Sequence, residues 1–221
     1  EQLKTEPGRL GPPGGGAVVV IDVKTGGVRA LVSYPEYDPN MFLGGQRGAY
    51  FAALEKDPLS PLFNRAIQGA YPPGSAFKPV TLLAALERRV TTPDEIYVAT
   101  GVVEVGGRVF RDWTVTRGLA PAGPVNAVTA MERSVNDYFY VMGSRAGIQA
   151  IAATARALGL GSSTGLDIRP QDSPGLVPDP QWKRTYQQEL WYPGDTANIS
   201  IGQGYLQVTP LQLAVMYAGL A

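Results

Sequence analysis

The chain has 221 residues, and its 19 Lys and Arg balance its 19 Asp and Glu, so the formal net charge is zero. Nucleic-acid-binding proteins usually show a basic excess or a basic stripe, and this sequence shows neither. The chain has no cysteine and no histidine, which excludes disulfides, thiol nucleophiles, Ser-His-Asp triads and most zinc sites. Any general base must therefore be Lys, Asp, Glu, Tyr or an activated water.

The N-terminal stretch suggests a segment of a longer protein. The chain begins at Glu1 rather than at a methionine, and residues 1–16 are polar and end in a Gly/Pro-rich run. Such a composition is typical of a flexible linker. No apolar run reaches the ~18–20 residues that a membrane span requires. We therefore expect a linker over 1–16, a folded domain over 17–221, and an anchor or targeting signal, if there is one, upstream.

The first half of the chain predicts one hairpin and one helix. Two β-branched runs, 17–23 and 28–34, flank the turn residues Lys24–Gly27 and predict a β-hairpin. The first run is almost entirely apolar, which predicts a strand buried on both faces. Residues 35–74 are rich in Gly, Pro and Asn and predict irregular structure. Apolar residues at helical spacing predict a helix over 75–89.

The second half predicts a second hairpin and three helices. The hairpin is expected over 102–109, and the first two helices over 126–134 and 137–158. Several prolines in 161–200 predict loops. Thr209 and Pro210 open a last helix as its N-cap and its first helical residue. Strands and helices follow one another without a βαβ rhythm, which favours an α+β fold.

One candidate for chemistry is the pair Ser75 and Lys78. A serine at a helix N-terminus lies where backbone N–H groups stabilise negative charge. Lys78 follows three residues later on the same face, so its amine can approach the Ser75 hydroxyl. A partly desolvated lysine has a lowered pKa and can accept the serine proton. The plainer alternative is that Ser75 caps the helix and Lys78 is solvated.

A second candidate is Ser134-Val135-Asn136, between two predicted helices. A hydroxyl and an amide two residues apart at a bend can point the same way. The hydroxyl could relay a proton, while the amide could bind a substrate carbonyl and the lysine. The plainer alternative is that Ser134 or Asn136 caps a helix.

The two candidates together carry a family resemblance. S-x-x-K followed roughly 60 residues later by S-x-N is the order found in penicillin-binding proteins and serine β-lactamases. The surrounding sequence resembles the class B penicillin-binding proteins, the elongation type (penicillin-binding protein 2) more than the division type. The stretches that carry this resemblance, over about 16–221, are Tyr34-Pro35, Tyr37–Asn40, Asn64–Gly69, Tyr71–Ser75, Arg111–Trp113, Ser134–Tyr140, Ile201–Tyr205 and Thr209–Gln212.

The resemblance implies a D,D-transpeptidase that cross-links peptidoglycan during cell-wall elongation. Ser75 would be the acylated nucleophile and Lys78 its base. Ser134 would pass the proton to the leaving D-alanine, and Asn136 would hold the substrate backbone. The Ser75 N–H would supply half of an oxyanion hole. The implied fold is the penicillin-binding transpeptidase and serine β-lactamase-like fold, an antiparallel sheet flanked by helices plus a helical lobe, with the site between them.

The resemblance also implies partners and a location. The substrates would be stem peptides ending in D-Ala-D-Ala, and β-lactams would acylate the serine and inhibit the enzyme. No cofactor and no metal are implied. Relatives are usually anchored to the inner membrane with the catalytic domain on the periplasmic side. They are expected to act beside a polytopic glycosyltransferase.

The family's third motif, Lys-Thr/Ser-Gly, is expected on a strand beyond Ala221. The chain does contain Lys24-Thr25-Gly26, but it precedes the nucleophile and has the composition of a hairpin turn. We therefore treat it as a turn and expect an incomplete domain, which by itself would be inactive.

Three other functions remain open from the sequence. A β-lactam sensor domain would carry the same two motifs, although the stretches 65–74 and 111–113 fit the biosynthetic enzymes better. A class A β-lactamase needs a glutamate that positions water, and 161–200 offers only Glu189. A non-catalytic scaffold that activates a partner polymerase would not need the intact serines and lysine.

Three further stretches suit structural roles. Asp112 and Trp113 are expected to support the fold rather than to contact substrate. Tyr138–Tyr140 is expected in the core. Gly202–Gly204 is expected to form a turn before the last helix.

Overall fold

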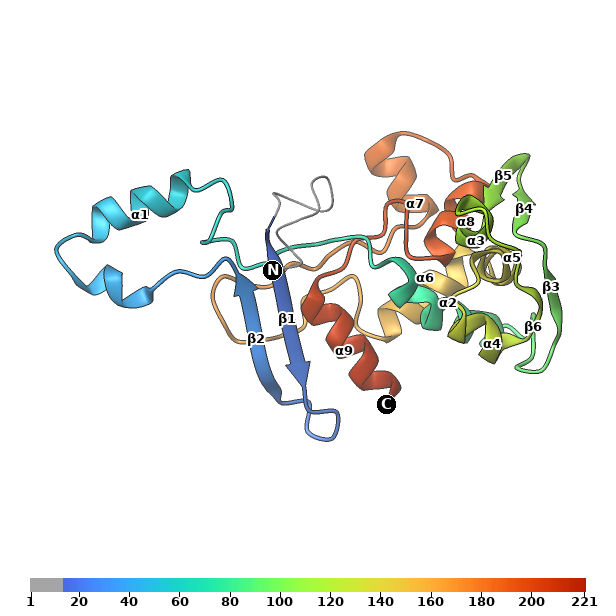
Figure 1. Ribbon diagram of the computed structural model, residues 1–221, viewed down its shortest axis with the longest axis horizontal. Coiled ribbons are helices and arrows are strands. Elements are labelled where there is room, and N and C mark those ends of the chain that lie inside the picture. The colour runs from blue at the N-terminus through green and yellow to red at the C-terminus, as the bar shows by residue number, and fades with distance from the viewer. Residues whose placement is uncertain (1–13) are drawn as a thin grey trace. The chain divides into compact units, whose positions relative to one another are not determined.

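The computed structural model describes residues 14–221 and shows two compact units (Figure 1). The first unit contains residues 14–71, Ser162–Gly175 and Val208–Ala221. The second contains Pro72–Gly161 and Leu176–Gln207. Most of the expected linker lies outside the described residues, and Gly16 already begins the first strand.

The first unit is built on the predicted hairpin. Strand β1, Gly16–Ile21, pairs antiparallel with β2, Val28–Tyr34. The connecting turn is held by Asp22, whose Oδ1 accepts hydrogen bonds from the backbone N–H groups of Lys24 and Thr25 at 3.0 and 3.2 Å. The prediction of a turn at Lys24-Thr25-Gly26 is therefore confirmed, and side chain-to-backbone bonding of this kind is why Asp favours such turns.

The prediction that β1 is buried on both faces is wrong. Val18 and Val20 are 55% and 46% exposed. The alternate residues, Val19 and Ile21, pack against the core of this unit. Because successive side chains of a strand point to opposite faces, β1 has one partly buried face and one exposed apolar face.

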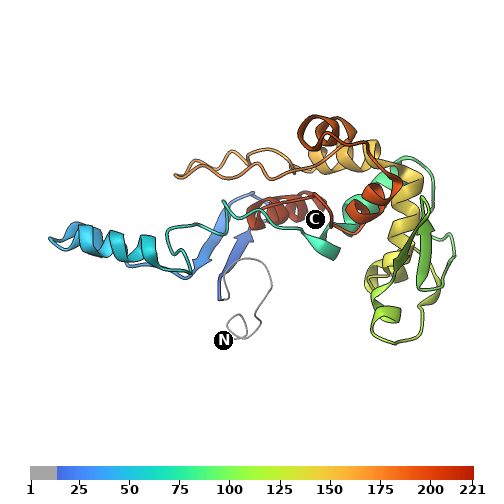
Figure 2. The same cartoon turned by 90° about the horizontal axis from the view of Figure 1, so that it is seen from above.

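The predicted last helix, α9 (Pro210–Leu220), is confirmed and packs along β1 (Figure 2). Thr209 caps it, with its hydroxyl accepting from the Gln212 N–H and the Gln212 side chain accepting from the Thr209 N–H. This reciprocal capping box satisfies two of the backbone donors that a helix start leaves free.

The irregular structure predicted for 35–74 is only partly correct. A 3₁₀ turn at Pro39–Leu43 and helix α1 at Arg47–Lys56 lie in this stretch (Figure 1). Only Leu54 of α1 is buried, so the helix lacks the apolar stripe by which a sequence normally reveals a helix.

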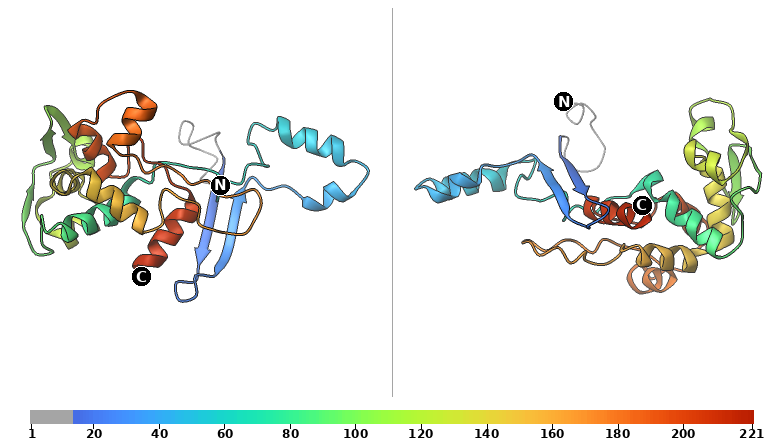
Figure 3. Two further views of the ribbon diagram at one scale, coloured as in Figure 1. Left: turned by 180° about the vertical axis from the view of Figure 1, so that it is seen from behind. Right: turned by 90° about the horizontal axis from the view of Figure 1, so that it is seen from below.

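The second unit is mainly helical (Figure 3). Helix α5 packs against α2 and α8, and α2 also packs against α6. The close approach of α5 to α8 requires Gly143, where a Cβ would overlap the Ser200 hydroxyl. These helices are α2 Lys78–Glu87, α5 Asn136–Ala146, α6 Ile148–Ala157 and α8 Pro193–Ser200.

Two helix predictions in this unit need correction. The single helix predicted over 137–158 is two helices, which meet at Gly147 with φ 82°. Residues 161–200 are predicted to be rich in loops, but the prediction misses α8, which Pro193 starts because proline fits the first helical position, where no N–H bond is needed.

Small strand pairs and short helices complete the second unit. The hairpin predicted over 102–109 is confirmed as β4, Val102–Val105, with β5, Arg108–Arg111. None of the helices in residues 14–221 is long and apolar enough to cross a membrane. Strand β3, Tyr97–Ala99, pairs with β6, Gly123–Val125. The short helices are α3 Trp113–Thr116, α4 Ala127–Glu132 and α7 Pro180–Trp182. A π-helical turn, Lys183–Gln187, follows α7.

Candidate active site

The first candidate pair lies at the start of α2. Ser75 is exposed in a 3₁₀ turn, Gly74–Phe77, that leads into the helix, whereas Lys78 is only 1% exposed. Gly74 has φ 57°, and its N–H donates to the Gly202 carbonyl at 2.9 Å, which fixes the residue before the serine. Ser75 is therefore not a helix cap and Lys78 is not solvated, so the plainer alternative is wrong.

The second candidate lies between α4 and α5. Ser134 has φ 53°, a left-handed conformation that costs a non-glycine residue of order 1 kcal/mol or more and is often found at functional sites. Val135 is the N-cap of α5, and Asn136 is its first residue. This bend directs the Ser134 hydroxyl and the Asn136 amide to the same amine, as the spacing predicts.

The two pairs meet at the Lys78 amine. Its Nζ donates to the Ser134 carbonyl at 2.7 Å, to Ser134 Oγ at 2.9 Å and to Asn136 Oδ1 at 2.6 Å. An ammonium group has three donors, and all three are used here. Ser134 Oγ donates in turn to Ser75 Oγ at 3.0 Å.

This arrangement differs from the expected direct approach of Lys78 to Ser75. Within residues 14–221, no hydrogen bond joins the Lys78 amine directly to the Ser75 hydroxyl. Ser134 stands between them and touches both. The donors run from Lys78 through Ser134 to Ser75, and the same contacts can carry a proton from Ser75 through Ser134 to Lys78 when the amine is neutral and the two hydroxyl groups turn.

The electrostatics of the site are set by burial and by two carboxylates. Burial lowers the pKa of Lys78 to about 8, while the negative charges of Asp112 and Asp137 act in the opposite direction. The ring of Phe139 also faces the amine, with its centroid 5.2 Å from Nζ. An amine with such a pKa has a substantial neutral fraction near neutral pH and can act as a base.

A family described as the penicillin binding protein transpeptidase domain matches residues 16–221. The chain belongs to this family. A curated relative, the peptidoglycan D,D-transpeptidase MrdA of Acinetobacter baumannii, is 38% identical over 205 residues. The match covers 92% of this chain but 30% of that protein.

Solved structures agree with this assignment and confirm the expected α+β fold. The complex of PBP2 and MreC from Helicobacter pylori contains a similar chain at 37% identity and TM-score 0.83, over 90% of this chain and 36% of that one. The penicillin G acyl-enzyme complex of penicillin-binding protein A from Mycobacterium tuberculosis is similar at 32% identity and TM-score 0.77. That match covers 94% of this chain and 46% of the other.

The structural roles expected within this transpeptidase domain are largely confirmed. Tyr138, Phe139 and Tyr140 are buried. Gly202 and Gly204 lie in turns that precede the last helix, as predicted. Gly202 lies so close to Gly74 that a Cβ on Gly202 would overlap the Gly74 carbonyl. Glu189 is 58% exposed and pairs with Lys183 at 3.4 Å.

The sequence predicts a structural role for Asp112 near the site but does not predict its bond to the backbone of Asn136. Asp112 is 1% exposed, and its carboxylate accepts a 2.6 Å hydrogen bond from the backbone N–H of Asn136. An acid directly before a tryptophan gives no sign of this, because 24 residues separate the partners. Trp113 itself is 37% exposed.

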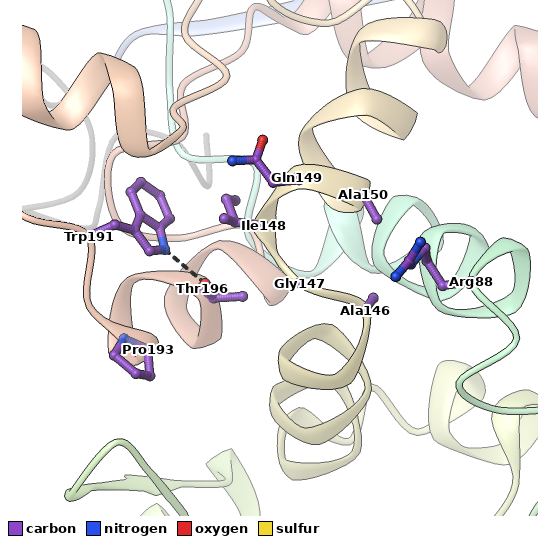
Figure 4. A pocket seen from close by; sticks show the side chains of 9 residues that line it. All are labelled: Arg88, Ala146, Gly147, Ile148, Gln149, Ala150, Trp191, Pro193 and Thr196. Atoms are coloured by element: carbon purple, nitrogen blue, oxygen red, sulfur yellow. Dashed lines mark hydrogen bonds between the residues drawn. The ribbon is translucent and has the colours of Figure 1, made fainter.

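A cavity of about 750 Å³ elsewhere in the second unit of this transpeptidase domain contains none of the four candidate residues. Figure 4 shows Trp191 on one side of it, bonded to Thr196, with Arg88 on the other and Gly147 between α5 and α6. The candidate chemistry is therefore associated with the exposed Ser75 hydroxyl and not with this cavity.

Proposed function

We propose that the protein is a peptidoglycan D,D-transpeptidase that cross-links stem peptides through an acyl-enzyme on Ser75. The observation that carries the proposal is the continuous chain of contacts from the exposed Ser75 hydroxyl through Ser134 to the buried amine of Lys78. Membership of the transpeptidase family and the acyl-enzyme complex of a relative support it. The chain spans only 30% of the length of its MrdA relative, so the activity is proposed for the full protein that contains it.

The proposed acylation begins with attack of Ser75 Oγ on the carbonyl carbon of the penultimate D-alanine. The Ser75 proton moves to Ser134 as the Ser134 proton moves to neutral Lys78. The Ser75 N–H stabilises the oxyanion, an interaction whose loss typically costs on the order of 3 kcal/mol. The C–N bond then breaks, Ser134 protonates the leaving D-alanine amine, and Lys78 returns its proton to Ser134.

Deacylation follows the same path with a second stem peptide. Its amine attacks the ester carbonyl carbon to form the new C–N bond, and its proton passes through Ser134 to Lys78. The bond between the acyl carbon and Ser75 Oγ then breaks, and Lys78 returns the proton through Ser134 to Ser75 Oγ, which regenerates the hydroxyl and releases the cross-linked peptide. The Asn136 Oδ1 accepts from Lys78, and its amide N–H₂ donates to no group within residues 14–221; in this proposal that N–H₂ binds the substrate backbone. A β-lactam would acylate Ser75 in the same way and remain attached.

We also propose the setting in which the protein acts. By analogy with the family, the domain would lie on the periplasmic side of the inner membrane, anchored by a segment outside this chain. A polytopic glycosyltransferase would polymerise the glycan strands beside it. The H. pylori relative in complex with MreC supports a role with protein partners.

The test is intact-mass spectrometry of the full-length protein after incubation with benzylpenicillin. The wild type should gain one penicillin mass, and peptide mapping should locate it on Ser75. Ser75→Ala should gain none while keeping the wild-type unfolding temperature. Ser144→Ala, at an exposed serine of the same unit, is the matched control and should be labelled normally. An adduct retained by Ser75→Ala would refute the proposal.

Labelling alone does not separate an enzyme from a β-lactam sensor. Incubation with lipid II polymer should therefore give cross-linked muropeptides after digestion, detected by mass spectrometry. Penicillin labelling without any cross-linked product would favour the sensor, and neither labelling nor product would favour the scaffold.

A further inference from the structure

The buried carboxylate of Asp112 makes no hydrogen bond to Ser75, Ser134 or Lys78, yet it is bonded to Asn136, in the bend that carries the three acceptors of the Lys78 amine. We propose that Asp112 is a positioning residue: it fixes the Ser134–Asn136 bend and, through its charge, holds the Lys78 amine against that bend. This inference rests on the proposed transpeptidase function and assigns a further residue to it.

The first argument is that one carboxylate caps two helices. Asp112 Oδ1 accepts from the Thr114 N–H at 2.9 Å and from the Thr114 hydroxyl at 2.8 Å, which caps α3. Its Oδ2 accepts from the Asn136 N–H at 2.6 Å. The N-cap residue of α5 is Val135, whose side chain has no acceptor, so Asp112 supplies the missing cap from another segment. A negative charge is favourable at this end of a helix.

The second argument is that the capped segment is the one that carries the acceptors of the lysine. Asn136 provides Oδ1, and Ser134, two residues earlier, provides its carbonyl and its hydroxyl. Ser134 is held at φ 53°, and such a conformation persists only where the surroundings impose it. A charge-assisted hydrogen bond to the next turn of chain is an interaction strong enough to impose it.

The third argument is electrostatic. The carboxylates acting on Lys78 are those of Asp112 and Asp137, and Phe139 presents its ring. The two acids are tied to one residue: the Asp112 N–H donates to the Gly101 carbonyl, and the Gly101 N–H donates to Asp137 Oδ2, both at 2.8 Å. Tyr140 lies in the same environment, where burial and then these carboxylates raise its pKa to about 12. Asp112 differs from Asp137 in that it bonds directly to the bend.

The test is the pH dependence of acylation by benzylpenicillin in the full-length Asp112→Asn protein. In the wild type the acylation rate should rise with pH through the pKa of Lys78, about 8. Loss of the negative charge disfavours protonated Lys78, so the rising limb should move to lower pH. Loss of the bond to Asn136 should reduce the plateau by about tenfold to a hundredfold, the value of a hydrogen bond to a charged group.

If Asp112 had only a structural role, Asp112→Asn would lower the plateau of the acylation rate and leave the pH of the rising limb unchanged. That result would overturn the proposal. Asp179→Asn is the matched control, because Asp179 also caps a helix, accepting from the Trp182 N–H at 2.8 Å, but pairs with Arg156 and is not one of the two carboxylates that act on Lys78. It should change neither limb nor plateau. Asp112→Glu keeps the charge and displaces the oxygen, so it should lower the plateau and keep the limb near its wild-type pH.

Two further measurements separate the possible failures. If Asp112→Asn does not fold, Asp112→Glu decides, and an unchanged plateau in that variant refutes the positioning role. If the wild type is not acylated at all, the proposed function fails. The effect of Asp112 on Lys78 can still be measured, by NMR titration of ¹³C-labelled lysine assigned with Lys78→Arg. A Lys78 titration that is the same in wild type and Asp112→Asn would refute the inference by itself.

Discussion

Replacing Ser134 by alanine separates a relayed proton path from a direct one. The substitution removes the oxygen that lies 2.9 Å from the Lys78 amine and 3.0 Å from the Ser75 hydroxyl. With a pKa of about 8, about one Lys78 in ten is neutral at pH 7, roughly 300 times more than for a lysine with the ordinary value. This advantage reaches Ser75 only through Ser134.

Ser134→Ala should therefore slow acylation by benzylpenicillin by about 10²–10⁴-fold, the usual contribution of a positioned acid–base group. The rate is measured by rapid quench and intact-mass spectrometry from pH 6 to pH 9. If both residues serve one path, the double variant with Lys78→Ala should be no slower than the slower single variant. Ser144→Ala is the control. A Ser134→Ala rate close to wild type, or fully multiplicative effects, would show that Lys78 acts on Ser75 directly.

Three further substitutions, in the site and elsewhere in the second unit, have outcomes that the structure predicts. Lys78→Arg keeps the positive charge but cannot become neutral, so acylation should lose its rise near pH 8 and fall by at least about a hundredfold; a wild-type pH profile would exclude the lysine as base. Gly202→Ala places a Cβ against the Gly74 carbonyl and should abolish acylation, whereas Gly204→Ala, which shares the positive φ without that overlap, should retain much of it. Asn126→Ala removes a capping box and should lower the free energy of unfolding by about 1 kcal/mol in urea titration, with the acylation rate of folded protein unchanged.

Local patterns predict the elements that local interactions determine. The hairpin turn at Lys24-Thr25-Gly26 and the start of α9 at Thr209 depend on neighbours within a few residues, and both are predicted correctly. Pro193 shows the limit of this reasoning: proline at the first helical position and proline in a loop look alike in sequence. The exposed face of β1 shows another limit, because an apolar run does not reveal which of its faces is covered.

The candidate site is predictable as a set of residues but not as a geometry. The order of the two motifs, S-x-x-K and then S-x-N, with the family resemblance that it carries, identifies the four side chains that the structure connects. It does not say that Ser134 stands between the other serine and the lysine, since that depends on how α2 packs against α5. Nor does it identify Asp112, whose bond to Asn136 joins segments that are far apart in the chain.

A chain without histidine needs another group that changes its protonation state near neutral pH, and the surroundings of Lys78 show how a lysine can be adapted to this. Burial alone disfavours the ammonium form and lowers the pKa of the amine, while the carboxylates of Asp112 and Asp137 restore part of that form. Without the carboxylates the amine would be neutral more often but would be a weaker base, which would return protons readily and accept them poorly. Without burial it would stay charged at neutral pH. The value of about 8 therefore reflects two opposing effects, and a base that must accept a proton in one step and return it in the next requires both.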